Sequence, residues 1–185
     1  MLPGISTEQL RSRLNRMVAD GMLTRKRYRE VPPRVDYELT ERARELMPIL
    51  GELARWGYEW AWTPPRTSES VDIGAIFRLA PGLLRGSGVS GTVACTVTGE
   101  PDRTYTVTLT PGETLIEERP AEMSDASISG GVAAWVEAFS PQPERARLEL
   151  AGDLSLANRL LDGLTGVQPA RAAAASSNPG TIAAA

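Results

Sequence analysis

The side chains that carry most enzyme chemistry are scarce in this sequence of 185 residues, which has no histidine and a single cysteine, Cys95. The lack of imidazole excludes triads that use histidine as a base, HExxH metal sites and Cys/His zinc sites. Glu117 and Glu118 are neighbours on an expected strand, so their carboxylates point to opposite faces. Gly130-Gly131 is a turn signal outside any phosphate-loop motif. We therefore predict a protein that is not an enzyme and that holds no metal and no cofactor.

The single cysteine, Cys95, also indicates the cell compartment in which the protein is expected. A lone cysteine forms no intramolecular disulfide, which fits a reducing cytoplasm. The N-terminus lacks the pattern of a signal peptide, and no run approaches the roughly 20 apolar residues of a membrane span. We expect a soluble cytoplasmic protein without a membrane span, in which Cys95 can simply be a buried small residue.

A cluster of basic side chains is the strongest chemical signal in the chain. Residues 11–34 hold eight Arg or Lys against two Asp or Glu, although the whole chain has a net charge of −3. Such a local density of cations is typical of a surface that binds phosphate groups. It is also compatible with a solvated charged face, so the sequence leaves both readings open.

The first element expected to carry these cations is a helix over residues 6–20. Ser6 and Gln9 have the spacing of a capping box, and Gly21 is a typical end signal. The apolar residues between them recur at helical spacing and leave polar and basic residues on the opposite side: Leu10, Leu14, Met17 and Val18.

A hairpin and a second helix are expected next. Residues 23–28 and 35–39 alternate as half-buried strands do, which predicts a hairpin with a basic tip. Thr40 has the position of a cap for a long helix over 41–60, which Pro48 should bend or restart. Helix, basic hairpin and helix is the order of the C-terminal half of a winged helix-turn-helix, in which a helix enters the major groove and the hairpin lies on the DNA backbone.

Specific segments strengthen this interpretation. PGIS, DGML, TRKRYREVPPRVDYELTE and LMPILGELARWG follow one another within residues 2–62 and together resemble the HxlR-type transcriptional regulators. The resemblance implies a dimer that binds double-stranded DNA. The residues implied to face bases, phosphates and the DNA backbone are Gln9, Ser12, Arg13 and Arg16 in the helix, and Arg25, Lys26, Arg27, Arg29 and Arg34 in the wing. For Arg13 and Arg25 a salt bridge to a nearby carboxylate is the alternative.

The resemblance is to an N-terminally truncated form of that fold. In HxlR-type proteins further helices precede the recognition helix, and they need roughly 40 to 50 residues. We therefore expect the apolar face of the helix over 6–20 to be exposed or to meet another molecule. The helix end Trp56–Trp62 is the candidate dimer interface, and packing of its tryptophans on the second domain is the alternative.

A second pattern begins near residue 70. The elements expected are a helix at 71–79 ended by Pro81-Gly82, strands at 91–98, 104–110 and 114–118, a helix through 132–139, a strand at 147–150 and a helix at 154–164. The strands at 91–98 and 104–110 alternate strictly, which puts Cys95 and Tyr105 on a face opposite a row of threonines.

This order, with the closing segment ARLELAGDLSLANRLLDGL, resembles the sterol carrier protein type 2-like domain over residues 70–167. The resemblance implies helices that lie against a curved sheet, an enclosed apolar cavity, and a bound lipid or other apolar small molecule. The alternative is that the large apolar residues fill an ordinary core: Phe77, Trp135, Phe139 and Leu161.

The predicted fold class is α+β, a partial winged helix-turn-helix followed by a small sterol-carrier-like domain. The expected bounds are 1–62 for the DNA-binding domain, 63–69 for a linker, 70–167 for the sterol-carrier-like domain and 168–185 for a disordered tail. The predicted function is a dimeric DNA-binding transcriptional regulator whose C-terminal domain takes an apolar small molecule. The alternative is a truncated protein that binds an apolar ligand and no DNA.

Overall fold

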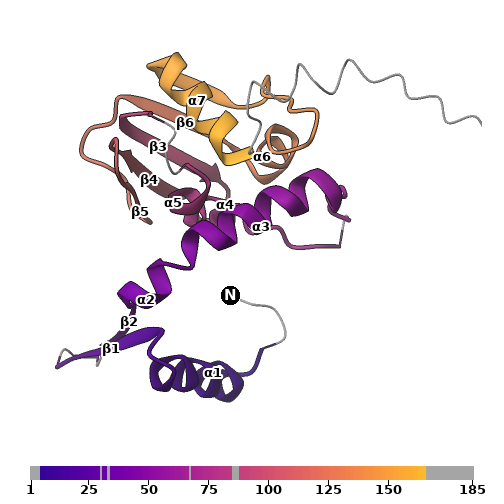
Figure 1. Cartoon of the computed structure of the whole chain (residues 1–185). Coiled ribbons are helices and arrows are strands. Elements are labelled where there is room, and N and C mark those ends of the chain that lie inside the picture. The colour runs from indigo at the N-terminus through magenta and orange to yellow at the C-terminus, as the bar shows by residue number, and fades with distance from the viewer. Residues whose placement is uncertain (1–4, 30, 33, 67, 85–87, 166–185) are drawn as a thin grey trace, which may run out of the picture. The chain divides into compact units, whose positions relative to one another are not determined.

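The computed structural model of the protein describes residues 5–29, 31–32, 34–66, 68–84 and 88–165 (Figure 1). The chain divides into two compact units, residues 1–49 and 50–185. The domain bounds expected from the sequence, near residues 62 and 70, stay a prediction, and the expected tail at 168–185 lies outside the described residues.

The first unit begins with helix α1, Thr7–Ala19. The Ser6 hydroxyl accepts a hydrogen bond from the backbone N–H of Gln9 at 3.2 Å, and the Gln9 side-chain oxygen accepts one from the Ser6 N–H at 3.3 Å. Gly21, at a φ of +70°, follows the helix in a conformation that favours glycine. The predicted capping box and helix end are both confirmed.

The predicted hairpin is also confirmed. Strands β1, Leu23–Tyr28, and β2, Arg34–Leu39, pair antiparallel over their whole length. Two helices then replace the single bent helix: α2, Glu41–Arg44, and α3, Met47–Trp60. Pro48 lies in the first turn of α3, where a residue without an N–H costs no helical hydrogen bond. The predicted restart therefore occurs.

The first unit buries little apolar surface. Helix α1 has no buried residue, and among the described residues of this unit Leu23 and Ala43 are the hydrophobic side chains that are buried. Several of its apolar residues are about 40% exposed: Leu10, Met17, Val35 and Leu39. The exposed apolar face expected for this helix is therefore present.

The second unit is a five-stranded mixed sheet with helices. Its strands lie in the order β5-β4-β3-β6-β7, with β3 parallel to β6 and the other pairs antiparallel (Figure 1). The strands are β3, Gly91–Thr98; β4, Arg103–Leu109; β5, Thr114–Glu117; β6, Ala126–Gly131; and β7, Glu149–Gly152. The helices that follow α3 are α4, Ile73–Arg78; α5, Ala80–Leu83; α6, Val132–Ala138; and α7, Leu154–Thr165. The α+β class is confirmed.

Two local predictions were wrong. Strand β6 was missed because Ser127, Gly130 and Gly131 are typical of turns. The strand needs small residues, since a Cβ on Gly130 would lie 2.6 Å from Cδ2 of buried Leu148. Pro81-Gly82, which was expected to end a helix, instead lies within α5, where Pro81 occupies the first turn.

The core of the second unit lies on one face of this sheet. The alternation predicted for β3 and β4 is confirmed, since Cys95 and Tyr105 are at most 1% exposed. Phe77 lies at the centre of the aromatic cluster, with its ring centroid 5.1 Å from that of Tyr105 and 5.0 Å from that of Trp135. The indole N–H of Trp135 donates to the Thr96 carbonyl at 3.1 Å, which satisfies the polar atom of this buried ring.

Candidate functional sites

Helix α1 places four of the predicted DNA-contact residues on one exposed face. Gln9, Ser12, Arg13 and Arg16 follow the i, i+3, i+4, i+7 spacing of a helix stripe, and all are exposed. Arg16 lies 3.7 Å from Asp20, but both side chains are more than 60% exposed, so this pair restrains the guanidinium little. No ion pair to Arg13 is present within the described residues.

The wing separates its cations into two faces. Arg25 pairs across the hairpin with Tyr37, and Arg27 pairs with Val35. Because side chains alternate along a strand, Lys26 points to the opposite face. The Arg25 guanidinium lies 5.9 Å from the centroid of the Tyr37 ring, an aromatic contact that leaves its charge in place. The face with Arg25 and Arg27 therefore presents two cations.

The other face of the wing is neutralised within the protein. The Lys26 ammonium lies 2.7 Å from a Glu38 carboxylate oxygen. The hydrogen bond to Glu38 and its charge raise the pKa of Lys26 above the ordinary value. Arg34 makes a bidentate contact with Asp36, at 2.9 and 2.7 Å, and covers the Tyr28 ring at 5.5 Å. Lys26 and Arg34 therefore have carboxylate partners that a phosphate would have to replace.

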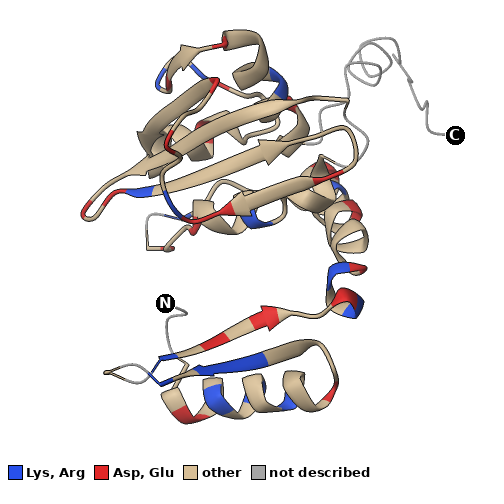
Figure 2. Ribbon diagram, turned by 90° about the vertical axis from the view of Figure 1, so that its left-hand side faces the viewer, with Lys and Arg blue, Asp and Glu red and all other residues tan. Residues whose placement is uncertain are grey.

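Figure 2 shows the resulting charge distribution, with basic residues along α1 and β1 and acidic residues on β2. Arg29, the remaining predicted contact, follows β1 and is exposed. The structure thus brings Arg25 and Arg27 to one face of the wing and sets Lys26 and Arg34 apart from them.

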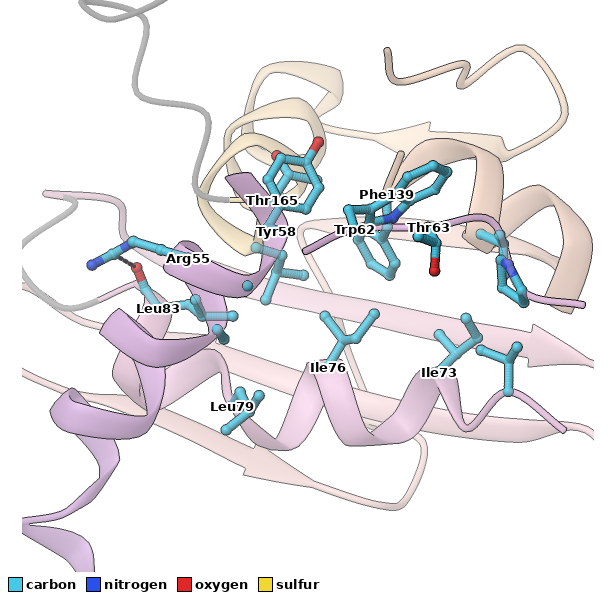
Figure 3. A pocket seen from close by; sticks show the side chains of 16 residues that line it. Arg55, Tyr58, Trp62, Thr63, Ile73, Ile76, Leu79, Leu83, Phe139 and Thr165 are labelled. Atoms are coloured by element: carbon cyan, nitrogen blue, oxygen red, sulfur yellow. Dashed lines mark hydrogen bonds between the residues drawn. The ribbon is translucent and has the colours of Figure 1, made fainter. Parts of the chain in front are cut away.

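The second unit contains an apolar pocket of about 280 Å³ (Figure 3). Its walls come from α3, the segment that follows it, α4, α5, α6 and α7. Most of the side chains that line it are apolar, among them Trp62, Val71, Ile73, Ile76, Leu79, Leu83, Val136, Phe139 and Leu164. The predicted alternatives both hold in part, because Phe77, Trp135 and Leu161 fill the core whereas Phe139 also lines the pocket.

The polar groups around the pocket are mostly satisfied. The Tyr58 hydroxyl donates to the Ser140 carbonyl at 2.5 Å, and burial raises the pKa of Tyr58 above its ordinary value. The Thr165 hydroxyl bonds to carbonyls of its own helix. Arg55, at the end beside Leu83 in Figure 3, contacts the Leu83 carbonyl and Glu52. Its Nε is buried and has no hydrogen-bond partner within the described part of the chain.

Helix α3 has two apolar surfaces. Ala54, Gly57 and Tyr58 line the pocket. A second surface, which we call the α3 stripe, is exposed by 42–70% and consists of Leu50, Leu53, Trp56 and Trp60. Leu50, Leu53 and Trp56 are larger and more hydrophobic, but the buried side of α3 is the one with small residues.

The small residues of α3 were the missed signal. Gly51, Ala54 and Gly57 recur every three residues, and Gly51 allows a close approach to a neighbouring element, whereas a Cβ on Gly57 would meet no atom within 4 Å. The candidate dimer interface at Trp56–Trp62 stays a prediction, and its alternative, packing on the second domain, holds for one of the three tryptophans. Trp56 and Trp60 are 58% and 70% exposed, whereas Trp62 lines the pocket of the second unit.

Other chemistry has little support in the structure. Cys95 is buried, and its burial raises the pKa of the thiol to about 12, which leaves it protonated and unreactive. Among the described residues, no group of three His, Cys, Asp or Glu side chains is arranged to hold a metal ion. The helices in the described part of the chain are too short or too polar to cross a bilayer.

The basic helix and wing lie in the part of the chain that known proteins share. Residues 1–64 match the HxlR-like helix-turn-helix family. The HTH-type transcriptional regulator BH0655 of Halalkalibacterium halodurans is 49% identical over 53 residues, which are 29% of this chain and 47% of that protein. The HTH-type regulator sll1512 of Synechocystis is 44% identical over 59 residues, 32% of this chain and 44% of that protein. YkvN of Bacillus subtilis is 41% identical over 61 residues, 33% of this chain and 52% of that regulator.

These matches confirm the HxlR resemblance of the N-terminal segment. The chain spans about half the length of the curated relatives it matches. All three relatives are named as transcriptional regulators, not as enzymes.

Solved structures of sterol carrier proteins are similar to the remaining part of the chain. Palmitated SCP2L2 from Aedes aegypti has a TM-score of 0.40 and 17% identity, and the match covers 51% of this chain and 95% of that protein. TT1886 from Thermus thermophilus, titled a possible sterol carrier protein, has a TM-score of 0.37 and 20% identity, with 56% of this chain and 94% of that protein covered.

Proposed function

We propose that this protein is a DNA-binding transcriptional regulator whose second unit binds a small apolar molecule. The observation that carries the DNA-binding part is the pair of exposed basic surfaces in the first unit, the α1 face with Arg13 and Arg16 and the wing face with Arg25 and Arg27. Both lie within residues 1–64, the segment that matches a helix-turn-helix family. The α1 residues would read bases and nearby phosphates, and the wing arginines would contact the DNA backbone.

A salt series tests this function. Fluorescence anisotropy with a duplex from the region upstream of the protein's own gene should show binding that weakens steeply as salt rises, because each phosphate contact releases counterions. Arg13→Gln should weaken binding. Arg159→Gln, which removes an exposed arginine of the second unit, is the matched control and should bind like the wild type. Absence of binding at low salt would refute the DNA-binding function.

The pocket supports the ligand-binding part of the proposal. A cavity of about 280 Å³ is close to the lower end of the roughly 300–1,000 Å³ range of small-molecule sites, and such sites are mostly apolar. The ligand would have an apolar body that contacts Ile76, Leu79 and Phe139. A dansyl-labelled fatty acid should bind saturably to the full chain, and Ile76→Phe should reduce that binding by filling the pocket.

The alternative function is an apolar-ligand-binding module that does not bind DNA. Helix α1 favours it, since none of its residues is buried and a helix that is anchored weakly reads DNA less well. The two functions are separated by one pair of measurements. Saturable binding of the fatty-acid probe without any DNA binding at low salt would support the module, and binding of both would support the regulator.

Self-association is the third part of the proposal. The α3 stripe exposes two tryptophans, and fully covered aromatic side chains bury about 150–250 Å² each. Leu53, Trp56 and Trp60 are three and four residues apart, the spacing at which apolar residues of one helix meet those of another. A second copy presents the same stripe, so a two-fold pairing of α3 helices would cover both.

Sedimentation of the full chain tests this association. Leu53→Lys should shift the equilibrium toward monomer because it places a charge in the pairing surface. Met123→Lys is the matched control, since Met123 is 86% exposed and lies outside α3. A wild-type chain that stays monomeric at every concentration would contradict the dimer.

A further inference from the structure

The starting point is that α3 belongs to the pocket and to the α3 stripe at once. Ala54, Gly57 and Tyr58 line the pocket from one side of the helix. Leu53, Trp56 and Trp60 are exposed. At 3.6 residues per turn the exposed set is centred about 120° around the same 14-residue helix from the pocket set, so the two sets form different surfaces.

We infer that a ligand in the pocket regulates self-association through α3, and that pocket occupancy strengthens the pairing of two copies at the α3 stripe. This inference rests on the proposed function, because it takes the pocket as the ligand site and a second copy as the partner. It adds that the two sites are coupled, and it names the helix that couples them.

The packing of α3 supports the coupling. On the pocket side, the helix is held against the rest of its unit at Gly51 by direct backbone contact with Gly82 and at Tyr58 by a hydrogen bond to the Ser140 carbonyl. Between these two contacts, Ala54 and Gly57 border the pocket. Ala54 also packs on the core and Arg55 contacts the Leu83 carbonyl, but a Cβ on Gly57 would meet no atom within 4 Å. The empty pocket therefore leaves the helix without a neighbour at Gly57, and a ligand would supply one.

The direction of the effect follows from that gap. A helix that borders open space at Gly57 has more freedom to shift or bend there, and a partner that pairs with it must restrict this freedom. A ligand that has already restricted α3 removes part of that cost, which makes the two binding events mutually favourable. The ligand and the second copy do not compete for α3, because the residues that line the pocket differ from those of the α3 stripe.

The α3 stripe fits a second copy better than solvent. Trp56 and Trp60 keep more than half of their surface exposed, and tryptophan is among the residues that dominate interface energies. A standard interface buries about 800 Å² per partner, of which two covered tryptophans alone supply a substantial part.

Sedimentation of the full chain with and without the dansyl-labelled fatty acid tests the coupling. We expect the probe to lower the dimer dissociation constant by about 5- to 150-fold, the usual range of coupling between two sites. Linkage is reciprocal, so Leu53→Lys, which blocks pairing, should weaken probe binding to the full chain measured at a concentration where the wild type is dimeric. Met123→Lys should leave both values unchanged.

Two pocket-filling variants, each checked for folding, separate the loss of probe binding from a folding defect. Val136→Phe on α6 and Ile76→Phe on α4 should each abolish the response of the dimer to the probe, and circular dichroism shows whether each variant is folded. A folded variant that no longer binds the probe but still shows probe-enhanced pairing would overturn the inference.

The remaining outcomes distinguish the inference from the proposed function. If the probe binds and the dimer dissociation constant does not change, or rises, the inference is wrong and the ligand-binding function stands. If the probe does not bind, both fail. If the chain remains monomeric with and without the probe, as it would if another part of the same chain covered the α3 stripe, the inference fails and ligand binding is unaffected.

Discussion

Gly51 of α3 lies against Gly82 of α5 so closely that a Cβ on Gly51 would lie 2.6 Å from the Gly82 carbonyl carbon. Real Cβ atoms do not approach a backbone atom to this distance, so one of the two helices would have to move. The absence of a side chain at position 51 therefore allows α3 to pack on α5 within the second unit.

Gly51→Ala should destabilise the second unit by about 1–3 kcal/mol, the usual cost of overpacking a well-packed contact. Urea unfolding followed by tryptophan fluorescence measures it. Gly57→Ala is the matched control in the same helix, because a Cβ there meets no atom within 4 Å. Alanine favours helix over glycine, so the control should gain about 0.5–1 kcal/mol. Equal effects of the two variants would contradict the role of Gly51.

The two faces of the wing predict unequal effects on DNA binding. Arg25→Gln and Arg27→Gln should each weaken binding and lower the salt slope by about 1, since each removes a cation that is available to a phosphate. Lys26→Gln should have a smaller effect, because Lys26 lies 2.7 Å from Glu38 in the free protein. Anisotropy titrations at several salt concentrations provide both numbers. An equal or larger loss with Lys26→Gln would show that Glu38 releases Lys26 on binding.

The capping box should matter for α1. Ser6→Ala removes the acceptor for the Gln9 N–H, which should cost the helix about 0.5–2 kcal/mol. Because α1 has no buried residue, the loss should be local, and hydrogen exchange of the α1 amides should become faster. Ser12→Ala, the same change at an exposed position inside the helix, should leave exchange unchanged or slower. Faster exchange in Ser12→Ala than in Ser6→Ala would refute this assignment.

Cys95 should make the protein less stable at alkaline pH. The pKa of the thiol is about 12 in the folded protein against 9.0 when it is unburied. Below about pH 9 the thiol is protonated in both states and contributes no pH dependence. As the pH rises from about 9 to about 12, the unfolded thiol ionises first, so the free energy of unfolding falls by at most about 1.4 kcal/mol per pH unit.

The difference in unfolding free energy between the wild type and Cys95→Ala separates the effect of Cys95 from the ionisation of tyrosines such as Tyr58. Unfolding free energies of both proteins at a series of pH values should converge above pH 9. Alkylation provides a second measure, since native Cys95 should resist iodoacetamide and react once the chain is unfolded. Rapid reaction of the native protein would contradict the burial of the thiol.

Elements with strong local signals were predicted well from the sequence. The spacing of Ser6 and Gln9 predicted the start of α1, and the alternation of β3 and β4 predicted which side of each strand is buried. Strand β6 escaped prediction because Gly130 and Gly131 have the composition of a turn. Its place between β3 and β7 is set by pairing with residues at least 20 positions away, which no local pattern contains.

The candidate sites also combine features that the sequence predicts with features that it does not. That residues 11–34 are basic and that alternate wing residues point to opposite faces can be read from the sequence, because charge and strand periodicity are local properties. The pairing of Lys26 with Glu38 and the contact of Arg25 with the Tyr37 ring come from the folded hairpin, since both need its register. It also decided which side of α3 is buried. Hydrophobicity favoured the side with Leu53 and Trp56, but the close approach of Gly51 to Gly82 buries the side with small residues, which leaves the tryptophans exposed and places Ala54 and Tyr58 along the pocket.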